Sequence, residues 1–244
     1  MEHVVCSHIS HHLTSNSIIS PHQHGFLQRL SCETQLVTVI HDWARSLNHH
    51  GQVDVIFLDF AKAFDSVPHE RLLLKAHHYG IRGKLHNWLR SFLSGRRQRV
   101  VVLGISSDWS PVVSGVPQGT VLGPILFLLF INDLPNTISS NIKLFADDCV
   151  LYRNVNSVSD HYDLQKDLSR LESWAGNWQM SFAAKKCMKM TITLKRTPSL
   201  FDYRLCNHRL EGVSYQKYLG VVITSTLNWS TQCEEVKKIG RAHV

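Results

Sequence analysis

The sequence predicts an α+β protein in which an antiparallel sheet packs on helices. Residues 53–60 form a run of β-branched and aromatic side chains, which is typical of a strand. Apolar residues lie on both sides of Asp147-Asp148, which indicates a strand, a turn and a second strand. Residues 32–47 and 160–178 instead repeat apolar side chains at helical spacing. We therefore expect strands and helices in one mixed fold.

The other elements follow from the same periodicities and from glycine and proline as breaks. Pro68 is well placed to open a helix that runs to about Tyr79 and stops at Gly80. Residues 215–223 are expected to form a further strand. The expected elements, in order, are helices at 1–19, 32–47, 68–79 and 84–94, a two-stranded ribbon at 96–113, a helix at 124–133, the hairpin around 147–148, a helix at 160–178, a strand at 188–194, a hairpin at 201–210, a strand at 215–223 and a helix from about 229 to 244.

Length and composition exclude several classes of protein. With 244 residues and 43% hydrophobic side chains, the chain can bury a substantial core as one large domain, or as a domain plus a fragment. The longest apolar stretch, residues 121–131, is too short to cross a bilayer, and the N-terminus lacks the apolar core of a signal peptide. We expect a soluble intracellular protein of the nucleus or cytoplasm, neither secreted nor bound to a membrane.

The cysteines and the charge narrow the class of protein further. The six cysteines form no Cys-x-x-Cys pair, which argues against a zinc site and a disulfide framework and fits reduced thiols. The formal charge of +7 lies in the C-terminal part, because residues 181–244 hold 11 basic and 4 acidic side chains while residues 1–180 hold 15 of each. A basic segment beside an acidic site suits an enzyme that processes a polyanion.

Histidine is concentrated at the N-terminus. Six of the sixteen histidines fall within the first 24 residues. A metal site there is conceivable, but the spacing matches no common ligand pattern, and histidine also occurs on polar helix faces.

Asp147 and Asp148 are the most informative residues of the chain. Aspartate disfavours strands, and an unpaired buried carboxylate costs several kcal/mol, so two adjacent acids between apolar neighbours need a reason. Asp59 closes the apolar run 88 residues upstream. Magnesium is commonly held by one or two carboxylates together with substrate phosphates. The three aspartates therefore predict one cation site and a substrate that carries phosphate.

Two further segments could contact nucleic acid. The ribbon at 96–113 bears Arg96, Arg97 and Arg99, which could grip a phosphate backbone or only solvate an edge strand. Residues 114–120 are rich in glycine and proline and lead into a helix, where free amides favour a phosphate, although a plain turn would have the same composition.

Taken together, these motifs resemble those of reverse transcriptases from LINE-type, non-long-terminal-repeat retrotransposons. Residues 57–65 (FLDFAKAFD) are similar to the first catalytic motif of that family, residues 114–119 (SGVPQG) to the second and residues 145–148 (FADD) to the third. Trp178-Gln179-Met180, followed by Lys186-Cys187, and then Tyr218-Leu219-Gly220, occur in the usual places. The resemblance covers nearly the whole chain.

The resemblance implies a right-hand polymerase with a ferredoxin-like core, which synthesises DNA on an RNA template from a DNA primer and deoxynucleotides. Partial fingers would span about 1–50 and 80–114, the palm about 51–79 and 115–225, and residues 226–244 would begin the thumb. The upstream fingers, the endonuclease and most of the thumb of the longer element protein would be missing from this chain.

The resemblance also assigns roles at the centre of the site. Asp59 and Asp147 would each contact two magnesium ions, or manganese, with Phe60 and Asp148 beside them. Lys186 matches a candidate proton donor to the departing pyrophosphate, although it could equally be a solvated lysine.

The resemblance also assigns roles to residues that surround the three aspartates. Phe64 would be the steric gate that crowds a ribose 2′-hydroxyl, with a core aromatic as the alternative. Gln118 and Gly119 would line the incoming nucleotide and template base, and Tyr218-Leu219-Gly220 would form the primer-gripping hairpin that leads into the thumb. Asp54 and Asp65 are expected to be structural, because strand alternation directs them to other faces or beyond the strand end.

The chain also departs from the family. Leu27 and Leu30 stand where arginines are common, which puts triphosphate contacts from this loop in doubt, and Leu103 and Ala183 replace polar residues. Two other interpretations stay open: a catalytically inactive, truncated remnant that at most binds nucleic acid, and a metal-dependent nuclease or phosphatase. The latter would not account for Phe64 or for the glycine- and proline-rich loop.

Overall fold

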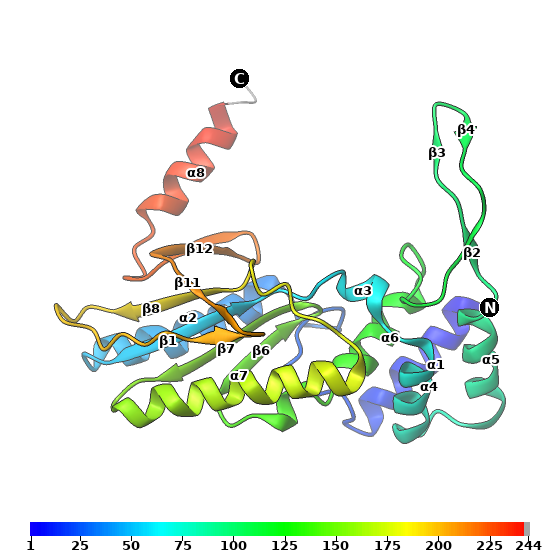
Figure 1. Ribbon diagram of the computed structural model, residues 1–244, viewed down its shortest axis with the longest axis horizontal. Coiled ribbons are helices and arrows are strands. Elements are labelled where there is room, and N and C mark those ends of the chain that lie inside the picture. The colour runs from blue at the N-terminus through cyan, green and yellow to red at the C-terminus, as the bar shows by residue number, and fades with distance from the viewer. Residues whose placement is uncertain (242–244) are drawn as a thin grey trace.

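A five-stranded sheet forms the centre of the molecule in the computed structural model, which describes residues 1–241 (Figure 1). The central strand β1 pairs antiparallel with β7 on one side and β8 on the other, and the short β11 runs parallel to β8. In the order β11-β8-β1-β7-β6, the strands are Glu211–Gly212, Met188–Thr193, Gln52–Leu58, Asp148–Asn154 and Asn141–Phe145. The predicted mixture of helices with an antiparallel sheet is confirmed.

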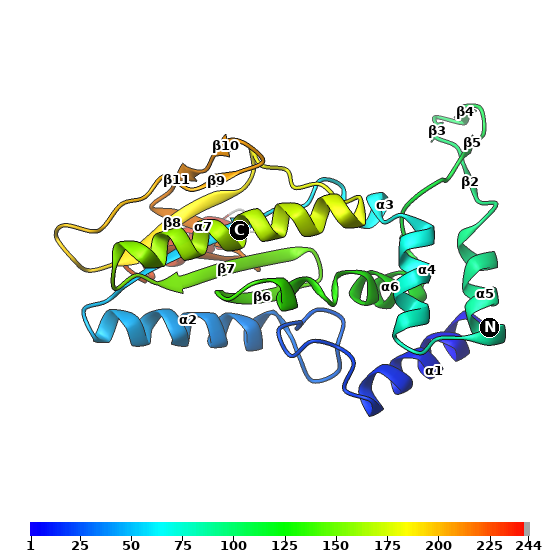
Figure 2. The same cartoon turned by 60° about the horizontal axis from the view of Figure 1, so that its bottom comes forward.

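Helices cover both faces of this sheet (Figure 2). Alternate residues of β1 point to opposite sides, so Val53, Val55 and Phe57 join the cluster that contains Trp43 of α2. Ile56 and Leu58 join the larger cluster on the side of α7. The two helices span Cys32–Asn48 (α2) and Val158–Trp178 (α7), and each begins at a serine with a capping box. The two amphipathic patterns in the sequence are thus confirmed as helices.

A group of helices stands at the other end of the molecule. Helix α6 is almost wholly buried among its neighbours, as its apolar sequence requires. A buried lysine, Lys75, lies 2.5 Å from Asp133 and 3.8 Å from the ring centre of Trp178, and burial lowers its pKa to about 8. No helix within residues 1–241 combines the length and apolar character needed to cross a bilayer. The group comprises α1 (Glu2–Ser15), α4 (His69–His78), α5 (Gly83–Leu93) and α6 (Leu122–Ile131), with the short α3 (Ala63–Ser66) and the 3-10 turn η1 (Leu134–Thr137) nearby.

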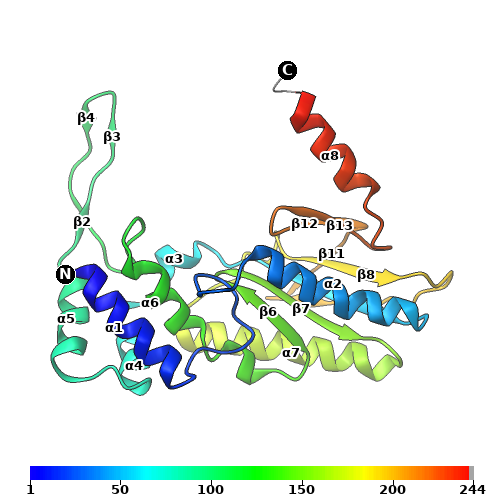
Figure 3. The same cartoon turned by 180° about the vertical axis from the view of Figure 1, so that it is seen from behind.

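Two appendages project from the same side of the body, at opposite ends of it (Figures 1 and 3). One is the predicted ribbon, which turns at Leu103-Gly104. The other is α8 (Ser230–Arg241), which follows the hairpin β12-β13; residues 242–244 of the expected helix lie outside the described residues. The ribbon strands are β2 (Arg97–Gln98), β3 (Val101–Val102), β4 (Ile105–Ser106) and β5 (Ser110–Pro111).

The expected single strand at 215–223 is wrong. The segment is a hairpin of β12 (Tyr215–Tyr218) and β13 (Val221–Thr224). Leu219 and Gly220 have φ of +46° and +86°, values that reverse the chain and that apolar periodicity does not reveal. The predicted hairpin at 201–210 is present as β9 (Arg204–Leu205) and β10 (His208–Arg209).

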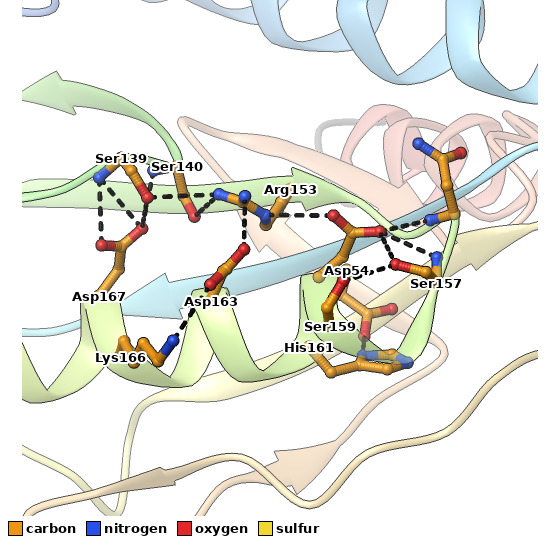
Figure 4. A network of polar contacts seen from close by, with 12 residues as sticks. Asp54, Ser139, Ser140, Arg153, Ser157, Ser159, His161, Asp163, Lys166 and Asp167 are labelled. Carbon is orange, nitrogen blue, oxygen red and sulfur yellow. Dashed lines mark hydrogen bonds and ion pairs between the residues drawn. The ribbon is translucent and has the colours of Figure 1, made fainter.

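A polar network ties β1 to α7 and to the segment before β9, and Figure 4 shows its link between Asp54 and His161. Asp54 is buried and accepts hydrogen bonds from Tyr203 Oη at 2.8 Å, from Thr191 Oγ1 at 3.0 Å and from Gln52 Nε2 at 3.1 Å. The Nδ1 atom of His161, a residue of α7, lies 3.1 Å from Asp54 Oδ2. The expected structural role of Asp54 is confirmed.

We expect Asp54→Ala to lower the free energy of unfolding by about 3 kcal/mol or more, because each buried donor left unpaired costs about 1–3 kcal/mol. Urea unfolding followed by tryptophan fluorescence measures the loss. Asp202→Ala is the control, since Asp202 is exposed and its pair with Arg209 contributes about 1 kcal/mol or less. Equal losses in the two variants would contradict the role given to the network.

Candidate active site

The predicted acidic residues meet at one end of the central sheet. In the β1-β7 register Leu58 lies opposite Cys149, so Asp59, one residue past β1, is beside Asp148 at the start of β7. In the β6-β7 hairpin Phe145 lies opposite Asp148, which leaves Ala146 and Asp147 as the two-residue turn. The fold therefore brings together carboxylates that are 88 residues apart in the sequence.

The electrostatics of this cluster favour a cation. Loss of surrounding water raises the pKa of Asp147, and the nearby charge of Asp59 raises it further against the opposing effect of its own main-chain hydrogen bond. Loss of water, followed by the charges of Asp147 and Asp59, raises the pKa of Asp148. The Nζ atom of Lys186 is 3.8 Å from Asp59 Oδ1 and compensates part of this negative charge. The cluster holds excess negative charge that a divalent cation would neutralise.

The residues present fit magnesium. It is a hard cation that takes oxygen ligands and is commonly bound through one or two carboxylates, with phosphates and water completing the shell. Asp59 and Asp147 supply such carboxylates in an open setting. Within residues 1–241, no set of three or more His, Cys, Asp or Glu side chains converges into a metal cage, and this holds for the three aspartates as well as for the N-terminal histidines. Ligands from a bound substrate would therefore complete the shell.

Asp59 is held by its main chain. The Ala183 amide donates to Asp59 O at 2.8 Å, and the Asp59 amide donates to Cys187 Sγ at 3.3 Å. Burial raises the pKa of Cys187 to about 11, so its sulfur stays a thiol at neutral pH. Phe60 is buried and its ring stacks on Phe182 at 4.5 Å, so only its main-chain carbonyl is available to a metal. The sequence reasoning missed Cys187 as a support of this site.

The glycine- and proline-rich loop docks on the segment that follows Asp59. The Val116 amide donates to Phe64 O at 2.8 Å, and Gln118 Nε2 donates to Asp65 Oδ1 at 2.8 Å. A side chain at Gly115 would meet the Asp65 main chain at 2.8 Å, so this close approach requires glycine. Gly119 has φ +76° and open space around it. The loop and the segment after Asp59 thus form one unit, which contains the three residues predicted to bind the nucleotide: Phe64, Gln118 and Gly119.

The Phe64 ring has two apolar contacts. It is stacked on Phe127 at 4.3 Å and meets the edge of Phe26 at 6.4 Å, and it remains half-buried. The steric-gate and core-aromatic interpretations are therefore both compatible with its position. The helix that follows the loop is less open than expected, because Glu2 Oε1 accepts the Leu122 amide at 2.9 Å. The expected phosphate position at the start of α6 already faces a carboxylate.

Comparison with known proteins identifies the family. A family model described as "Reverse transcriptase (RNA-dependent DNA polymerase)" matches residues 1–223. The chain belongs to the reverse transcriptase family. It is 30% identical over 231 residues to "RNA-directed DNA polymerase from mobile element jockey" of Drosophila melanogaster. The matched region covers 91% of this chain and 25% of that protein. The predicted relation to reverse transcriptases of LINE-type elements is confirmed.

Further relatives agree with this family. The chain is 29% identical over 257 residues to "Probable RNA-directed DNA polymerase from transposon X-element" of Drosophila melanogaster, covering 100% of this chain and 27% of that protein. It thus spans about a quarter of the length of these curated relatives. The solved structure of apo telomerase from Candida tropicalis, truncated from the C-terminal domain, shares the fold with a TM-score of 0.62 at 10% identity, over 93% of this chain and 44% of that one.

The residues predicted to contact nucleic acid lie on two separate elements, the projecting ribbon and the β12-β13 hairpin. Arg96, Arg97 and Arg99 are exposed on the projecting ribbon, and the Arg99 guanidinium lies 4.8 Å from the ring centre of Trp109 (Figure 1). Tyr218 corrects the prediction: its side chain is 5% exposed and its hydroxyl accepts a hydrogen bond from Gln35. This side chain packs in the core, so only the turn at Leu219-Gly220 faces outward. A tyrosine ending an apolar strand is readily mistaken for a surface contact.

Sequence reasoning also missed Gln23, which is buried beside the turn that carries Asp147. Its Oε1 atom accepts the Ala146 amide at 2.9 Å and the Gly25 amide at 2.7 Å. Ala146 has φ +54°, and a positive φ at a residue other than glycine costs on the order of 1–3 kcal/mol. The only signal in the sequence was the glycine at 25, which indicates close approach of two backbones.

We expect Asp148→Asn to raise the melting temperature of the metal-free chain at pH 7. The raised pKa means that the folded state binds a proton more tightly than the unfolded state, so this carboxylate lowers stability increasingly as pH rises through and above its ordinary range near 3.8. Calorimetry from the ordinary carboxyl range near pH 3.8 up to pH 7 should show a gain that is largest at neutral pH and shrinks toward acid. The control is Asp202→Asn, and a gain independent of pH would contradict the assignment.

Proposed function

We propose that this chain is the polymerase domain of a mobile-element reverse transcriptase, which extends a DNA primer along an RNA template with deoxynucleotides. The observation that carries the proposal is the meeting of Asp59 with the Asp147-Asp148 turn at one end of β1 and β7. The printed names of the relatives, RNA-directed DNA polymerases of mobile elements, support the same reaction.

The three aspartates and the Phe60 carbonyl would hold two magnesium ions, or manganese in their place. When bound, such ions activate the primer 3′-hydroxyl and stabilise the charge on the leaving pyrophosphate. Asp59 follows β1 and Asp147 lies in the turn before β7, so the pairing of β1 with β7 sets the width of the site. The raised pKa values of Asp147 and Asp148 mean that these carboxylates bind a cation less well as the pH falls.

Lys186 is suited to giving a proton to the departing pyrophosphate. Its side chain is 71% exposed and its Nζ atom is 3.8 Å from Asp59, so the ammonium can turn toward a phosphate without leaving the cluster. Its three N–H groups are donors, and the positive charge favours an anionic leaving group.

Phe64, Gln118 and Gly119 would receive the nucleotide. The docking of the loop on α3 places the open space at Gly119 in the same assembly as the half-buried ring of Phe64. A rigid ring backed by Phe127 cannot easily yield to a ribose 2′-hydroxyl, which favours deoxynucleotides. Gln118 is held by Asp65, so Asp65 would position a residue of the nucleotide site.

The two appendages would hold the nucleic acid. The ribbon with Arg96, Arg97 and Arg99 would belong to fingers at about 1–50 and 80–114, and the Leu219-Gly220 turn would touch the primer. The palm would comprise about 51–79 and 115–225, with residues from 226 opening a thumb. The endonuclease, upstream fingers and remaining thumb would come from other parts of a longer protein.

Primer extension on an RNA template tests the reaction. With magnesium or manganese, we expect Asp147→Asn to reduce extension by at least about 100-fold, since one preorganised electrostatic group is worth about 10²–10³ in rate. Asp202→Asn, a change of the same kind on an exposed residue, should extend like the unaltered chain. Absence of aspartate-dependent extension would favour an inactive remnant that at most binds nucleic acid.

Phe64→Val should relax the choice of sugar. Removing the ring opens room for a 2′-hydroxyl, and a contact of this size is worth about 10–200-fold in discrimination. Single-turnover incorporation of matched ribo- and deoxynucleotides gives the ratio. Phe201→Val serves as the control because Phe201 is a half-buried aromatic that stacks on His161. An unchanged ratio in Phe64→Val would leave Phe64 as a core aromatic only.

A further inference from the structure

The segment before α2 forms an extra edge of the central sheet. The Leu144 amide donates to His22 O at 2.9 Å, and the His24 amide donates to Leu144 O at 2.8 Å, so Gln23 bridges β6 in parallel. These bonds place the segment next to the strand that leads into the Asp147 turn. These main-chain hydrogen bonds fix the position of the segment along β6.

Gln23 then reaches the turn itself. Its side chain is 2% exposed, and its Oε1 atom accepts the amides of Gly25 and Ala146 together. The Nε2 atom is buried without a hydrogen-bond partner, so only the acceptor end of this side chain is used. A side chain at Gly25 would stand 2.5 Å from the Ala146 nitrogen, so the close approach depends on glycine there.

Ala146 has a backbone conformation and a buried amide that both require support from a hydrogen-bond acceptor. Its φ of +54° is a conformation that persists when surrounding bonds enforce it. Its amide lies one residue before Asp147 and is buried, so without an acceptor it would be an unpaired donor. Phe26, which follows Gly25 in the segment before α2, contacts the ring of Phe64. One short segment thus contacts both the acidic turn and the proposed nucleotide gate.

We infer that Gln23 is a positioning residue that fixes the Asp147-Asp148 turn in its metal-binding conformation by accepting the Ala146 amide. This inference rests on the proposed function. Partners that orient the ligands of a metal typically affect affinity or activity by 10–100-fold. Gln23 acts through the backbone, so its loss should weaken the cation site while leaving the rest of the fold in place.

The test compares Gln23→Met, which keeps the length and removes the amide oxygen, with Gln23→Glu, which keeps the acceptor. The probe is Mn²⁺ binding followed by electron paramagnetic resonance, on the chain with a dideoxy-terminated primer on RNA and the matching deoxynucleotide. We expect Gln23→Met to raise the Mn²⁺ dissociation constant about 10–100-fold and to speed hydrogen exchange at the Ala146 amide. Gln23→Glu should bind Mn²⁺ no more weakly than the unaltered chain.

Gln165→Met is the matched control, because Gln165 also accepts a main-chain amide, that of Arg204, outside the acidic cluster. It should leave Mn²⁺ affinity unchanged. Equal affinity in Gln23→Met and the unaltered chain would overturn the inference, as would equal weakening by Gln165→Met. If the unaltered chain itself binds no Mn²⁺ and extends no primer, the proposed function fails first and the inference falls with it.

Discussion

The antiparallel pairing of β1 with β7 is the constraint on which the site depends. Val53, Val55 and Phe57 must face the Trp43 side while Ile56 and Leu58 face the α7 side. A slip of one residue would send every side chain to the wrong face, so the two different cores specify the register strongly. Asp59 and the Asp147 turn meet only because that register places Leu58 opposite Cys149.

The site contains features that lower the stability of the folded state. Loss of surrounding water, together with the nearby carboxylates, raises the pKa values of Asp147 and Asp148, and Ala146 has a positive φ. Neutral groups from other segments support this arrangement: the amide of Gln23 and the thiol of Cys187 hold the backbone without neutralising the acids. A site that keeps its negative charge while its backbone is fixed is suited to binding cations and a phosphate-bearing substrate.

Much of this could be predicted from the sequence, and the misses share a physical cause. Strands with distinct buried faces, amphipathic helices and paired aspartates leave periodic or costly patterns, so the sheet, α2, α7 and the acidic cluster were predictable. Contacts between a side chain and a distant backbone leave no such pattern: Gln23 reaches Ala146 across 123 residues, and Glu2 reaches Leu122 across 120.

The remaining errors were local. The periodicity of residues 215–223 predicted one strand, but the chain reverses at Leu219-Gly220 and makes two. Tyr218 was assigned to the primer through the family resemblance, but its ring packs against Phe57 in the core. Burial of a residue at a strand end depends on what packs above it, which the sequence of that strand does not contain.

Anomalous diffraction from Mn²⁺ tests the central claim most directly, using crystals of the chain with an RNA template, a dideoxy-terminated primer and a matching deoxynucleotide. We expect two peaks about 3.5–4 Å apart between Asp59 and Asp147. Peaks elsewhere, or none beside these carboxylates, would contradict it.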